Sequence, residues 1–260
     1  MRIASFNING IKARIAGLSD WLAEASPDVV LLQETKSQDE NFPAEAIGDL
    51  GYNVAVHGQK GFNGVAILSK RPIEDVSRGL PGGDGDAQAR WIEAVIPGER
   101  GVVRVCNLYL PNGNPAPGPK FDYKLAWMAR LEDRARGLLA AEEVALMAGD
   151  WNVIPESRDA ARPGKWTEDA LFLPETRAAF RRILNLGLHD AIREVDQDDG
   201  VYTFWDYQRG AWARDDGIRI DHFLLTPQAA DRLRGAGVDR GPRDREKPSD
   251  HTPVWIELDV

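Results

Sequence analysis

Short apolar runs rich in valine, isoleucine and leucine recur along almost the whole chain, and they constrain the possible fold more than any other feature. Such runs are typical of strands buried on at least one face. They predict strands at 2–7, 28–33, 52–56, 64–68, 91–96, 102–110, 144–148, 218–225 and 254–258. Helical patterns occur between some of them, at 15–25, 120–141 and 174–186. Because the strands are partly consecutive and partly separated by helices, the pattern predicts a mixed, layered α/β fold.

The length and the loops favour a single domain. A chain of 260 residues can bury a sizeable core without disulfides, and its one cysteine, Cys106, excludes a disulfide framework and a cysteine-rich zinc site. The loop-like segments at 79–86, 111–119 and 241–250 are too short to be domain linkers, and the strand pattern resumes after each. We therefore expect one domain over 1–260 and, with no indication of an obligate oligomer, a monomer.

The sequence shows no membrane or export signal. No stretch approaches the roughly 18 apolar residues that a membrane helix needs. The first residues, Met-Arg-Ile-Ala-Ser-Phe-Asn, are typical of a strand rather than of a signal peptide. We expect a cytoplasmic protein with no membrane partner.

The charge balance appears at first to exclude nucleic acid. Lysine and arginine total 32 against 41 aspartates and glutamates, which gives a formal net charge of −9. On the simplest electrostatic rule, this value argues against a basic nucleic-acid clamp.

Polar and acidic residues recur where the predicted apolar strands begin or end. They are Asn7, Glu34, Tyr109, Asp150, Asn152, Asp221, Asp250 and His251. Ligand-binding and catalytic groups of layered α/β proteins gather where strands meet loops. Asn, Glu and Asp supply the hard oxygen ligands that suit Mg²⁺ or Mn²⁺, whereas one cysteine and four scattered histidines do not suggest zinc. A divalent cation, carboxylates and a histidine together can hydrolyse a phosphoester.

Each of these residues also has a simpler interpretation. A single acidic residue at a strand end is usually a solvated turn residue, and Asn7 could cap a turn. Asp221 is harder to explain in this way, because a carboxylate between Ile-Arg-Ile and Phe-Leu-Leu would be partly buried and would need a partner. Asp250 and His251 could be a pair of loop residues.

A set of motifs, in order along the chain, resembles a known family. The motifs are Phe6-Asn7-Ile8-Asn9-Gly10, Leu32-Gln33-Glu34-Thr35-Lys36, Gly64-Val65-Ala66-Ile67-Leu68-Ser69, Leu108-Tyr109, Gly149-Asp150-Trp151-Asn152, Arg219-Ile220-Asp221 and Ser249-Asp250-His251. The chain resembles the exonuclease III family of abasic-site endonucleases, in the endonuclease/exonuclease/phosphatase superfamily that includes DNase I. The resemblance extends from residue 2 to about 258.

The resemblance implies a four-layer α/β sandwich, in which two sheets pack face to face with helices outside. It also implies roles for individual residues. Glu34 would be the principal Mg²⁺ ligand, with Mn²⁺ as a substitute, Asn7 beside it and Asp250 close by. Asp150 would orient or deprotonate the attacking water with help from Asn152. His251, polarised by Asp221, would contact the scissile phosphate, and Tyr109 would lie near the phosphate or the leaving oxygen.

The chain departs from the family in the expected substrate pocket. One branch of the family has a tryptophan between the residues matching Gly217 and Arg219, where it helps to wall the pocket for an abasic sugar, and this chain has Ile218. Phe204 and Trp205 match the aromatic pair that precedes it, and Ile220 could line the pocket. An apolar pocket of this kind admits a flipped sugar that lacks its base. The replacement by Ile218 leaves the ranking of endonuclease, exonuclease and 3′-phosphatase activities open.

Further residues are candidates for DNA contact. Trp151 and Trp205 are expected in the core, whereas Trp166 and Trp212 lie in polar surroundings and either face DNA or pack internally. Arg90, Lys60 and the pair Lys70-Arg71 lie in or beside predicted loops and could contact the DNA backbone, although most such charges are solvated surface.

The function that these observations predict is a Mg²⁺-dependent DNA-repair phosphodiesterase. It would cleave 5′ to abasic sites in double-stranded DNA and remove 3′ nucleotides or 3′ blocking groups. Two alternatives are a phosphatase of the same fold acting on inositol phosphates or phospholipid head groups, and a non-catalytic binding protein. The second alternative predicts loss of Glu34, Asp150, Asp221 or His251, and all are present. The negative charge then predicts local, salt-sensitive contact with DNA through one basic face.

Overall fold

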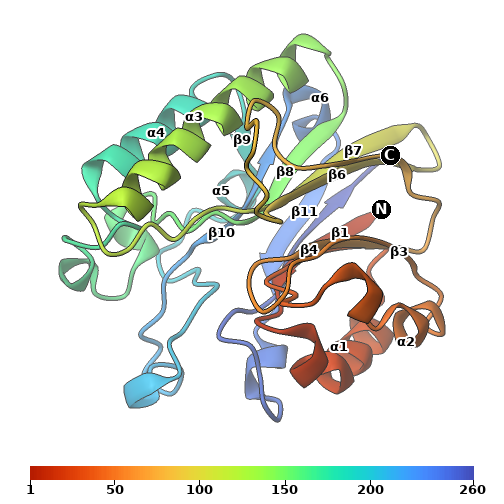
Figure 1. Ribbon diagram of the computed structural model, residues 1–260, viewed down its shortest axis with the longest axis horizontal. Coiled ribbons are helices and arrows are strands. Elements are labelled where there is room, and N and C mark those ends of the chain that lie inside the picture. The colour runs from red at the N-terminus through yellow and green to blue at the C-terminus, as the bar shows by residue number, and fades with distance from the viewer.

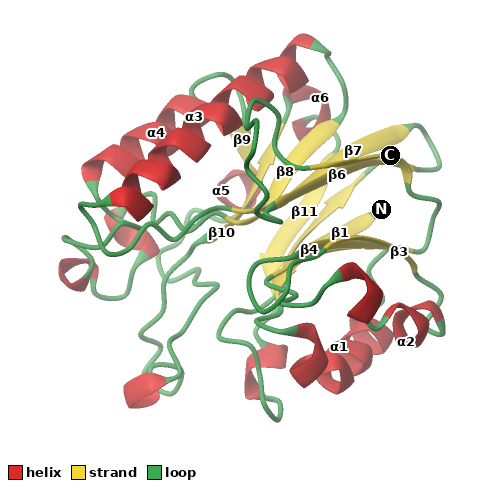
Figure 2. Ribbon diagram, viewed as in Figure 1, coloured by secondary structure: helices red, strands yellow, loops and turns green.

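The computed structural model describes residues 1–260 and contains two six-stranded sheets packed face to face, with helices on their outer faces (Figure 1; Figure 2). The first sheet has the order β11-β12-β1-β2-β4-β3 and the second β5-β6-β7-β8-β10-β9. The first is formed by β1 Arg2–Asn7, β2 Val29–Gln33, β3 Asn53–His57, β4 Val65–Ser69, β11 Leu233–Val238 and β12 Val254–Leu258. The second is formed by β5 Glu74–Arg78, β6 Trp91–Pro97, β7 Val102–Tyr109, β8 Ala145–Asp150, β9 His189–Asp190 and β10 Asp221–Leu225. The predicted four-layer α/β sandwich is confirmed.

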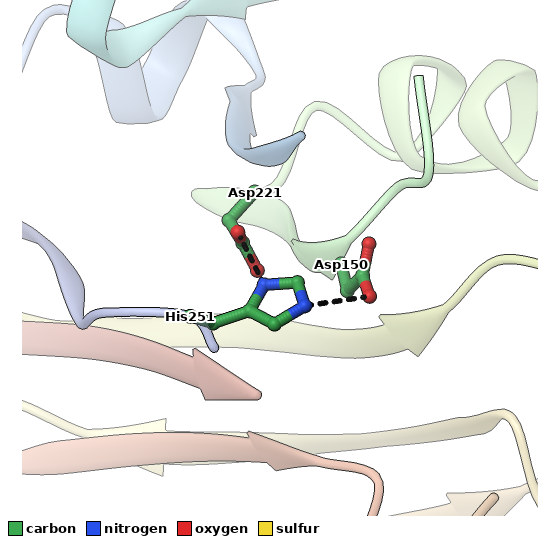
Figure 3. Close-up of side chains that lie close together, drawn as sticks. All are labelled: Asp150, Asp221 and His251. Atoms are coloured by element: carbon green, nitrogen blue, oxygen red, sulfur yellow. Dashed lines mark hydrogen bonds and ion pairs between the residues drawn. The ribbon is translucent and has the colours of Figure 1, made fainter. Parts of the chain in front are cut away.

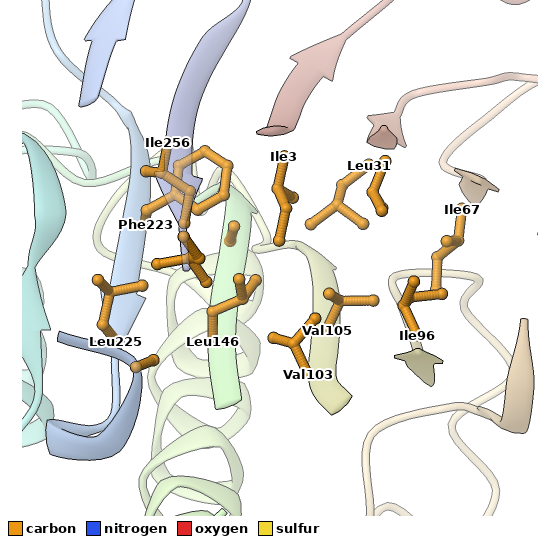
Figure 4. Packing of buried hydrophobic residues seen from close by; sticks show 14 of the residues in the cluster. Ile3, Leu31, Ile67, Ile96, Val103, Val105, Leu146, Phe223, Leu225 and Ile256 are labelled. Carbon is orange, nitrogen blue, oxygen red and sulfur yellow. The ribbon is translucent and has the colours of Figure 1, made fainter. Parts of the chain in front are cut away.

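The main core lies between the two sheets. Figure 4 shows Ile3, Leu31 and Ile67 of the first sheet opposite Val103, Val105 and Ile96 of the second. These residues alternate along their strands with residues that face the helices, which is the period-two pattern of a sandwich core.

Helices cover the two outer faces. Helices α1 Ile11–Ala25 and α2 Ala44–Gly48 pack on the first sheet, and α3 Pro119–Ala140 and α4 Pro174–Leu184 pack on the second (Figure 1). Two shorter helices, α5 Ala191–Val195 and α6 Pro227–Ala230, complete the set. None of the helices is both long enough and apolar enough to span a bilayer.

Three strands were missed by the sequence pattern, and one was placed too early. Strand β5 is Glu-Asp-Val-Ser-Arg at a sheet edge, where four of its five residues are exposed, so it has no apolar run to detect. Strand β11 contains two glycines, and β9 is only two residues long. The strand predicted at 218–225 begins at Asp221, because Ile218 instead forms isolated bridges with Phe204 and Ala160.

The topology brings several strand ends to one edge of the sandwich. Strands β1 and β2 are parallel, and so are β7 and β8, so their carboxyl ends lie at the same edge. Strand β10 runs antiparallel to β8, and its first residue, Asp221, is therefore opposite Asp150. Gly149 makes the close β7–β8 approach possible, because its φ is 148° and a Cβ there would lie 1.9 Å from the Leu108 carbonyl oxygen.

Candidate active site

Asn7 joins the two sheets at this edge. Its Nδ2 donates to Glu34 Oε1 (3.0 Å) at the end of β2 and to Asp150 Oδ2 (2.9 Å) at the end of β8. Its Oδ1 accepts the Asn9 backbone N–H at 3.0 Å, which fixes the orientation of the carboxamide. The predicted metal-site residue Asn7 is therefore in contact both with Glu34 and with the predicted base Asp150.

A buried histidine lies between two buried aspartates (Figure 3). His251 Nδ1 is 2.8 Å from Asp221 Oδ2, and its Nε2 is 3.7 Å from Asp150 Oδ2. Thr203 Oγ1 donates to the same oxygen of Asp221 at 2.7 Å, while Asp221 Oδ1 is buried without a partner. Two carboxylates directly opposite on adjacent strands repel each other, and an imidazolium between them offsets this repulsion.

The surroundings shift the pKa of both catalytic groups. Burial alone would lower the pKa of His251, but the charges of Asp221 and Asp150 and the hydrogen bond to Asp221 raise it to about 10. Burial, together with the charges of Asp221 and Glu34, raises the pKa of Asp150 to about 7 against the opposing effect of His251. The imidazole is therefore cationic at neutral pH, and Asp150 can exchange a proton there.

Glu34 begins a polar chain that leads to Asp250. Lys36 Nζ is 2.9 Å from Glu34 Oε2 and also bonds Asn9 Oδ1, and Asn9 Nδ2 donates to Asp250 Oδ1 at 3.0 Å. Burial would raise the pKa of Glu34, but the hydrogen bonds from Lys36 and Asn7 outweigh it and lower the pKa, so this carboxylate is ionised. Asp250 reaches Glu34 only through Asn9 and Lys36.

The donor set around Glu34 fits a hard divalent cation. Carboxylate and amide oxygens are the ligands that Mg²⁺ prefers, and Glu34 is an ionised, half-buried carboxylate. A second group with suitable geometry is Asp150, Asp221 and His251, whose ligand atoms lie within 4.8 Å of one another. There the cationic imidazole already occupies the space between the carboxylates, so Glu34 is the better centre for a metal.

Tyr109 and Asn152 lie next to Asp150 and complete the candidate site. The Arg90 guanidinium lies 4.8 Å from the Tyr109 ring centroid, and burial and the charges of Glu34 and Asp150 raise the pKa of Tyr109 well above its usual value. Tyr109 is therefore a neutral hydroxyl. Asn152 holds Asp150 through its backbone N–H, which donates to Asp150 Oδ1 at 2.9 Å, and its Nδ2 donates to the Leu110 carbonyl.

The residues predicted to form the sugar pocket lie at different depths. Ile218 and Ile220 are 1% and 2% exposed and belong to a small buried cluster, so they have almost no surface for a substrate. Phe204 is half-buried, packs on this cluster and lies with its ring centroid 5.0 Å from that of His251. Trp166 packs on the same cluster from another loop.

Trp212 is not a free DNA-facing side chain. Its Nε1 donates to Asp244 Oδ1 at 2.7 Å, and its ring centroid is 4.8 Å from that of the buried Trp205. The Arg240 guanidinium lies within 4.9 Å of both ring centroids. Trp212 therefore joins the loop that follows Phe204 to the 239–245 segment, and the prediction that it contacts substrate has no support here.

The basic candidates lie at opposite edges of the molecule. Exposed Lys60 is in the loop that enters β4 beside Glu34, where the Lys36 N–H bonds the Asn63 carbonyl. Lys70 and Arg71 follow the other end of β4, and Lys70 bonds Ser26 there. Strand β4 separates Lys70 and Arg71 from Glu34, so any contact they make with DNA would be away from this site, and that contact stays a prediction.

The sequence pattern missed several supporting residues. The largest omission is Lys124 of α3, a fully buried ammonium that donates to the carbonyls of Asn112 (3.0 Å), Asn152 (2.7 Å) and Ala170 (3.2 Å). Burial lowers the pKa of Lys124 to about 7. Ser249, whose Oγ donates to the Asn7 carbonyl, and Thr203 were also missed. Lys124 lies within the predicted helix 120–141. The one signal that could have indicated its role is that a lysine falls on the face of this helix that carries its apolar residues.

The site combines three groups: an ionised carboxylate suited to a metal, a candidate base and a fixed imidazolium. On a four-layer sandwich, this combination defines a phosphoester hydrolase. The chain belongs to the Endonuclease/Exonuclease/phosphatase family, whose model matches residues 4–251. It is 37% identical to exodeoxyribonuclease III of Haemophilus influenzae over 99% of this chain and 100% of that protein. Within the family it is an exonuclease III-type hydrolytic nuclease, as the motifs predicted.

Solved structures of similar proteins show the same fold over the whole chain. An AP endonuclease from Archaeoglobus fulgidus is 39% identical with a TM-score of 0.94, and each chain is covered completely. A variant of the 3′ phosphatase NExo from Neisseria, bound to a product DNA hairpin, is 37% identical with a TM-score of 0.95 and complete coverage of both chains.

Proposed function

We propose that the protein is a Mg²⁺-dependent DNA-repair phosphodiesterase that cleaves 5′ to abasic sites in duplex DNA and removes 3′ nucleotides or 3′ blocking groups. The observation that carries this proposal is the cationic His251 held between Asp221 and Asp150 and next to the Asn7–Glu34 pair. The similarity to an AP endonuclease and to a DNA-bound 3′ phosphatase supports DNA as the substrate.

Asp150, His251 and Tyr109 each have a separate role in the proposed reaction. Asp150, with a pKa of about 7, accepts a proton from the attacking water, and the Asn152 N–H and Asn7 Nδ2 fix its two oxygens. The His251 cation stabilises the negative charge that develops on the phosphoryl oxygens. Tyr109, whose hydroxyl is neutral, donates a hydrogen bond to the phosphate or to the leaving 3′-oxygen. Water attacks phosphorus, the P–O3′ bond breaks, and the products are a 3′-hydroxyl and a 5′-phosphate.

Glu34 is the residue that would hold the divalent cation, oriented by Asn7. Bound there, Mg²⁺ would polarise the phosphate and offset the charge of the leaving oxygen. Lys36 currently pairs with Glu34, so this lysine would have to yield its position or share the carboxylate with the ion.

A duplex with one abasic analogue tests the substrate and the metal together. We expect incision 5′ to the analogue with Mg²⁺ and none with EDTA, and phosphate release from a duplex that ends in a 3′-phosphate. Release of phosphate from an inositol phosphate with neither duplex cut would contradict the proposal and favour the phosphatase alternative.

Asp150→Asn tests the assigned base. The variant keeps the shape of the side chain but cannot accept the proton, so turnover should fall at least about a hundredfold while the Kd for uncut abasic duplex stays within a few-fold. Near-normal turnover would show that the role belongs to another residue.

A further inference from the structure

A cavity of about 270 Å³ lies beside the catalytic histidine, between the 162–169 and 206–216 loops. Its aromatic lining is Trp166 and Phe204, and the Phe204 ring contacts the His251 ring at 5.0 Å between centroids. Small-molecule sites usually measure about 300–1,000 Å³, so this cavity suits one small group rather than an oligomer. In Figure 1 the second loop projects from the lower left of the molecule, below the sheets.

The two aromatic residues are held in place by a buried cluster on the side away from the cavity. Both Trp166 and Phe204 pack on the buried cluster that contains Ile218 and Ile220, and both line the cavity. Phe204 also forms backbone bridges with Ile218 and His251, which set its distance from the catalytic histidine. A ligand in the cavity therefore meets a preorganised aromatic surface rather than mobile side chains.

The charges around the cavity balance. The lining includes three cations, Lys165, Arg209 and Arg214, and three carboxylates, Asp169, Asp206 and Asp216. Asp216 pairs with Lys165 at 2.6 Å, and Arg214 lies 3.8 Å from the same carboxylate. Arg162 also pairs with Asp216 at 2.7 Å, so the cations beside this carboxylate are already engaged and a second phosphate is not the expected occupant. The polar groups at the edge of the cavity have partners within the protein and free lone pairs or N–H groups besides, and these can pair with the edge of a heterocyclic base.

We infer that this cavity binds the nucleoside, base included, whose 5′-oxygen carries the scissile phosphate, and that Trp166 stacks on its base. This inference rests on the proposed function. Ile218 and Ile220, which would shape a pocket for a sugar without a base, are buried. The open cavity is instead lined by aromatic and polar side chains. Trp166 is then the residue that favours removal of an intact 3′-terminal nucleotide over incision at a site that lacks a base.

Paired substrates test the inference in the complete enzyme with Mg²⁺. Trp166→Leu keeps the buried cluster covered but removes the ring. Stacking of a base on an aromatic side chain predicts that kcat/KM for release of an unmodified 3′-nucleotide falls about tenfold, whereas incision at an abasic analogue changes less than about twofold. Trp166→Phe should recover most of the loss. Trp255→Leu, at a half-buried tryptophan of β12 outside the cavity, is the matched control and should affect both substrates equally.

Fluorescence gives a readout that does not depend on catalysis. With EDTA present, a duplex ending in 3′ 2-aminopurine should be quenched on binding to the wild type and to Trp166→Phe, and should lose most of this quenching with Trp166→Leu. Equal losses on both DNA substrates, or unchanged quenching in Trp166→Leu, would overturn the inference. If the wild type cuts neither substrate, the proposed function itself fails, which is a different result.

Discussion

His251 keeps its positive charge because Asp221 and Asp150 surround it. Its pKa of about 10 places the loss of the imidazolium in the alkaline range. In the proposed mechanism this cation stabilises the phosphoryl oxygens, so activity should fall as the pH rises through this pKa.

Asp221→Asn should move this alkaline loss of activity to lower pH. The variant removes the negative charge 2.8 Å from His251 Nδ1, so the pKa of the imidazole falls, by about one to three units for a contact of this kind. The profile of kcat/KM against pH on an abasic duplex measures the shift. An alkaline limb at the same pH in the variant and the wild type would show that Asp221 does not maintain the charge.

At the residue scale, the sequence identified the carboxylates but not what holds them. Asp221 was conspicuous because an acidic residue inside an apolar strand needs a partner, and His251 is that partner. The contacts of Asn7 with Glu34 and Asp150 depend on how two sheets pack, which no local pattern records. For the same reason Lys124, more than twenty residues from Asn152, could not be linked to the site.

At the scale of elements, helix α3 supports the β7–α3 and β8–α4 connections through one ammonium group. Lys124 donates to carbonyls in the loops after β7 and β8 and in the loop before α4, and an ammonium has one N–H for each of these three acceptors. The loop after β8 carries Asn152, whose backbone fixes Asp150. The buried face of helix α3 thus helps to fix the loop that positions Asp150, the proposed base.

Lys124→Met should lower both stability and turnover. The variant leaves the carbonyls of Asn112 and Asn152 without a donor, whereas the Ala170 carbonyl keeps its bond from Thr176 Oγ1, so we expect the free energy of unfolding to fall by about 3 kcal/mol. A small displacement of Asp150 should lower kcat about tenfold with little change in KM. Urea unfolding and steady-state kinetics measure the two effects. Lys120→Met, at an exposed position of the same helix, is the control, and equal behaviour of the two variants would contradict the prediction.

A buried ionic network joins the segment just before β10 to β9 and to the 157–159 segment. Arg219 pairs with Asp159 and Asp190 at 2.7 Å each, and Arg219 also lies 3.1 Å from His222 Nδ1. His222 Nε2 is 2.9 Å from the Val153 carbonyl. Together these contacts fit a neutral His222 that donates from Nε2 and accepts at Nδ1. Burial and then the charge of Arg219 lower the pKa of His222 to about 4.

Acid should therefore destabilise the fold through His222. Between pH 6.5 and about 4 the unfolded chain binds a proton on this residue and the folded chain does not, so stability present above pH 6.5 is lost as the pH falls through this window. A difference of this size corresponds to roughly 3 kcal/mol. Urea unfolding at pH 7, 5.5 and 4.5 should show a smaller pH dependence in His222→Gln than in the wild type. Parallel curves for the two proteins would rule out this role.

Elements with a strong apolar run were predicted to within a few residues, and weak ones were missed. Strand β1 has the predicted bounds, because Ile3, Ala4 and Phe6 are buried and give the strand a clear apolar pattern. Strand β5 was invisible because its edge position requires polar, exposed residues, and β11 is held by its pairing with β12 rather than by its composition. Edge strands depend on their neighbours, and a single sequence does not show those neighbours.

At the scale of the whole molecule, the net charge of −9 says little about the active face. The edge that carries the candidate site gathers Glu34, Asp150, Asp221 and Asp250; His251 partly neutralises them, and the proposed cation would add to this effect. Beyond about 8 Å at physiological ionic strength, exposed charges are screened from DNA at this edge. Binding therefore depends on the few cations near the site and not on the sum over the surface.

Two lysines of the β3–β4 hairpin test whether local cations, rather than the net charge, govern DNA binding. Lys60 is exposed and lies in the loop that enters β4 at the catalytic edge, and Lys70 lies just beyond the other end of β4, where it bonds Ser26. If Lys60 contacts one phosphate, Lys60→Ala should weaken DNA binding and reduce the slope of log Kd against log salt by about one. Lys70→Ala removes the same charge from the same protein and should leave the slope unchanged. Titrations of abasic duplex in EDTA between 50 and 200 mM salt give both slopes. Equal reductions in the two variants would mean that overall charge, rather than local contact, governs binding.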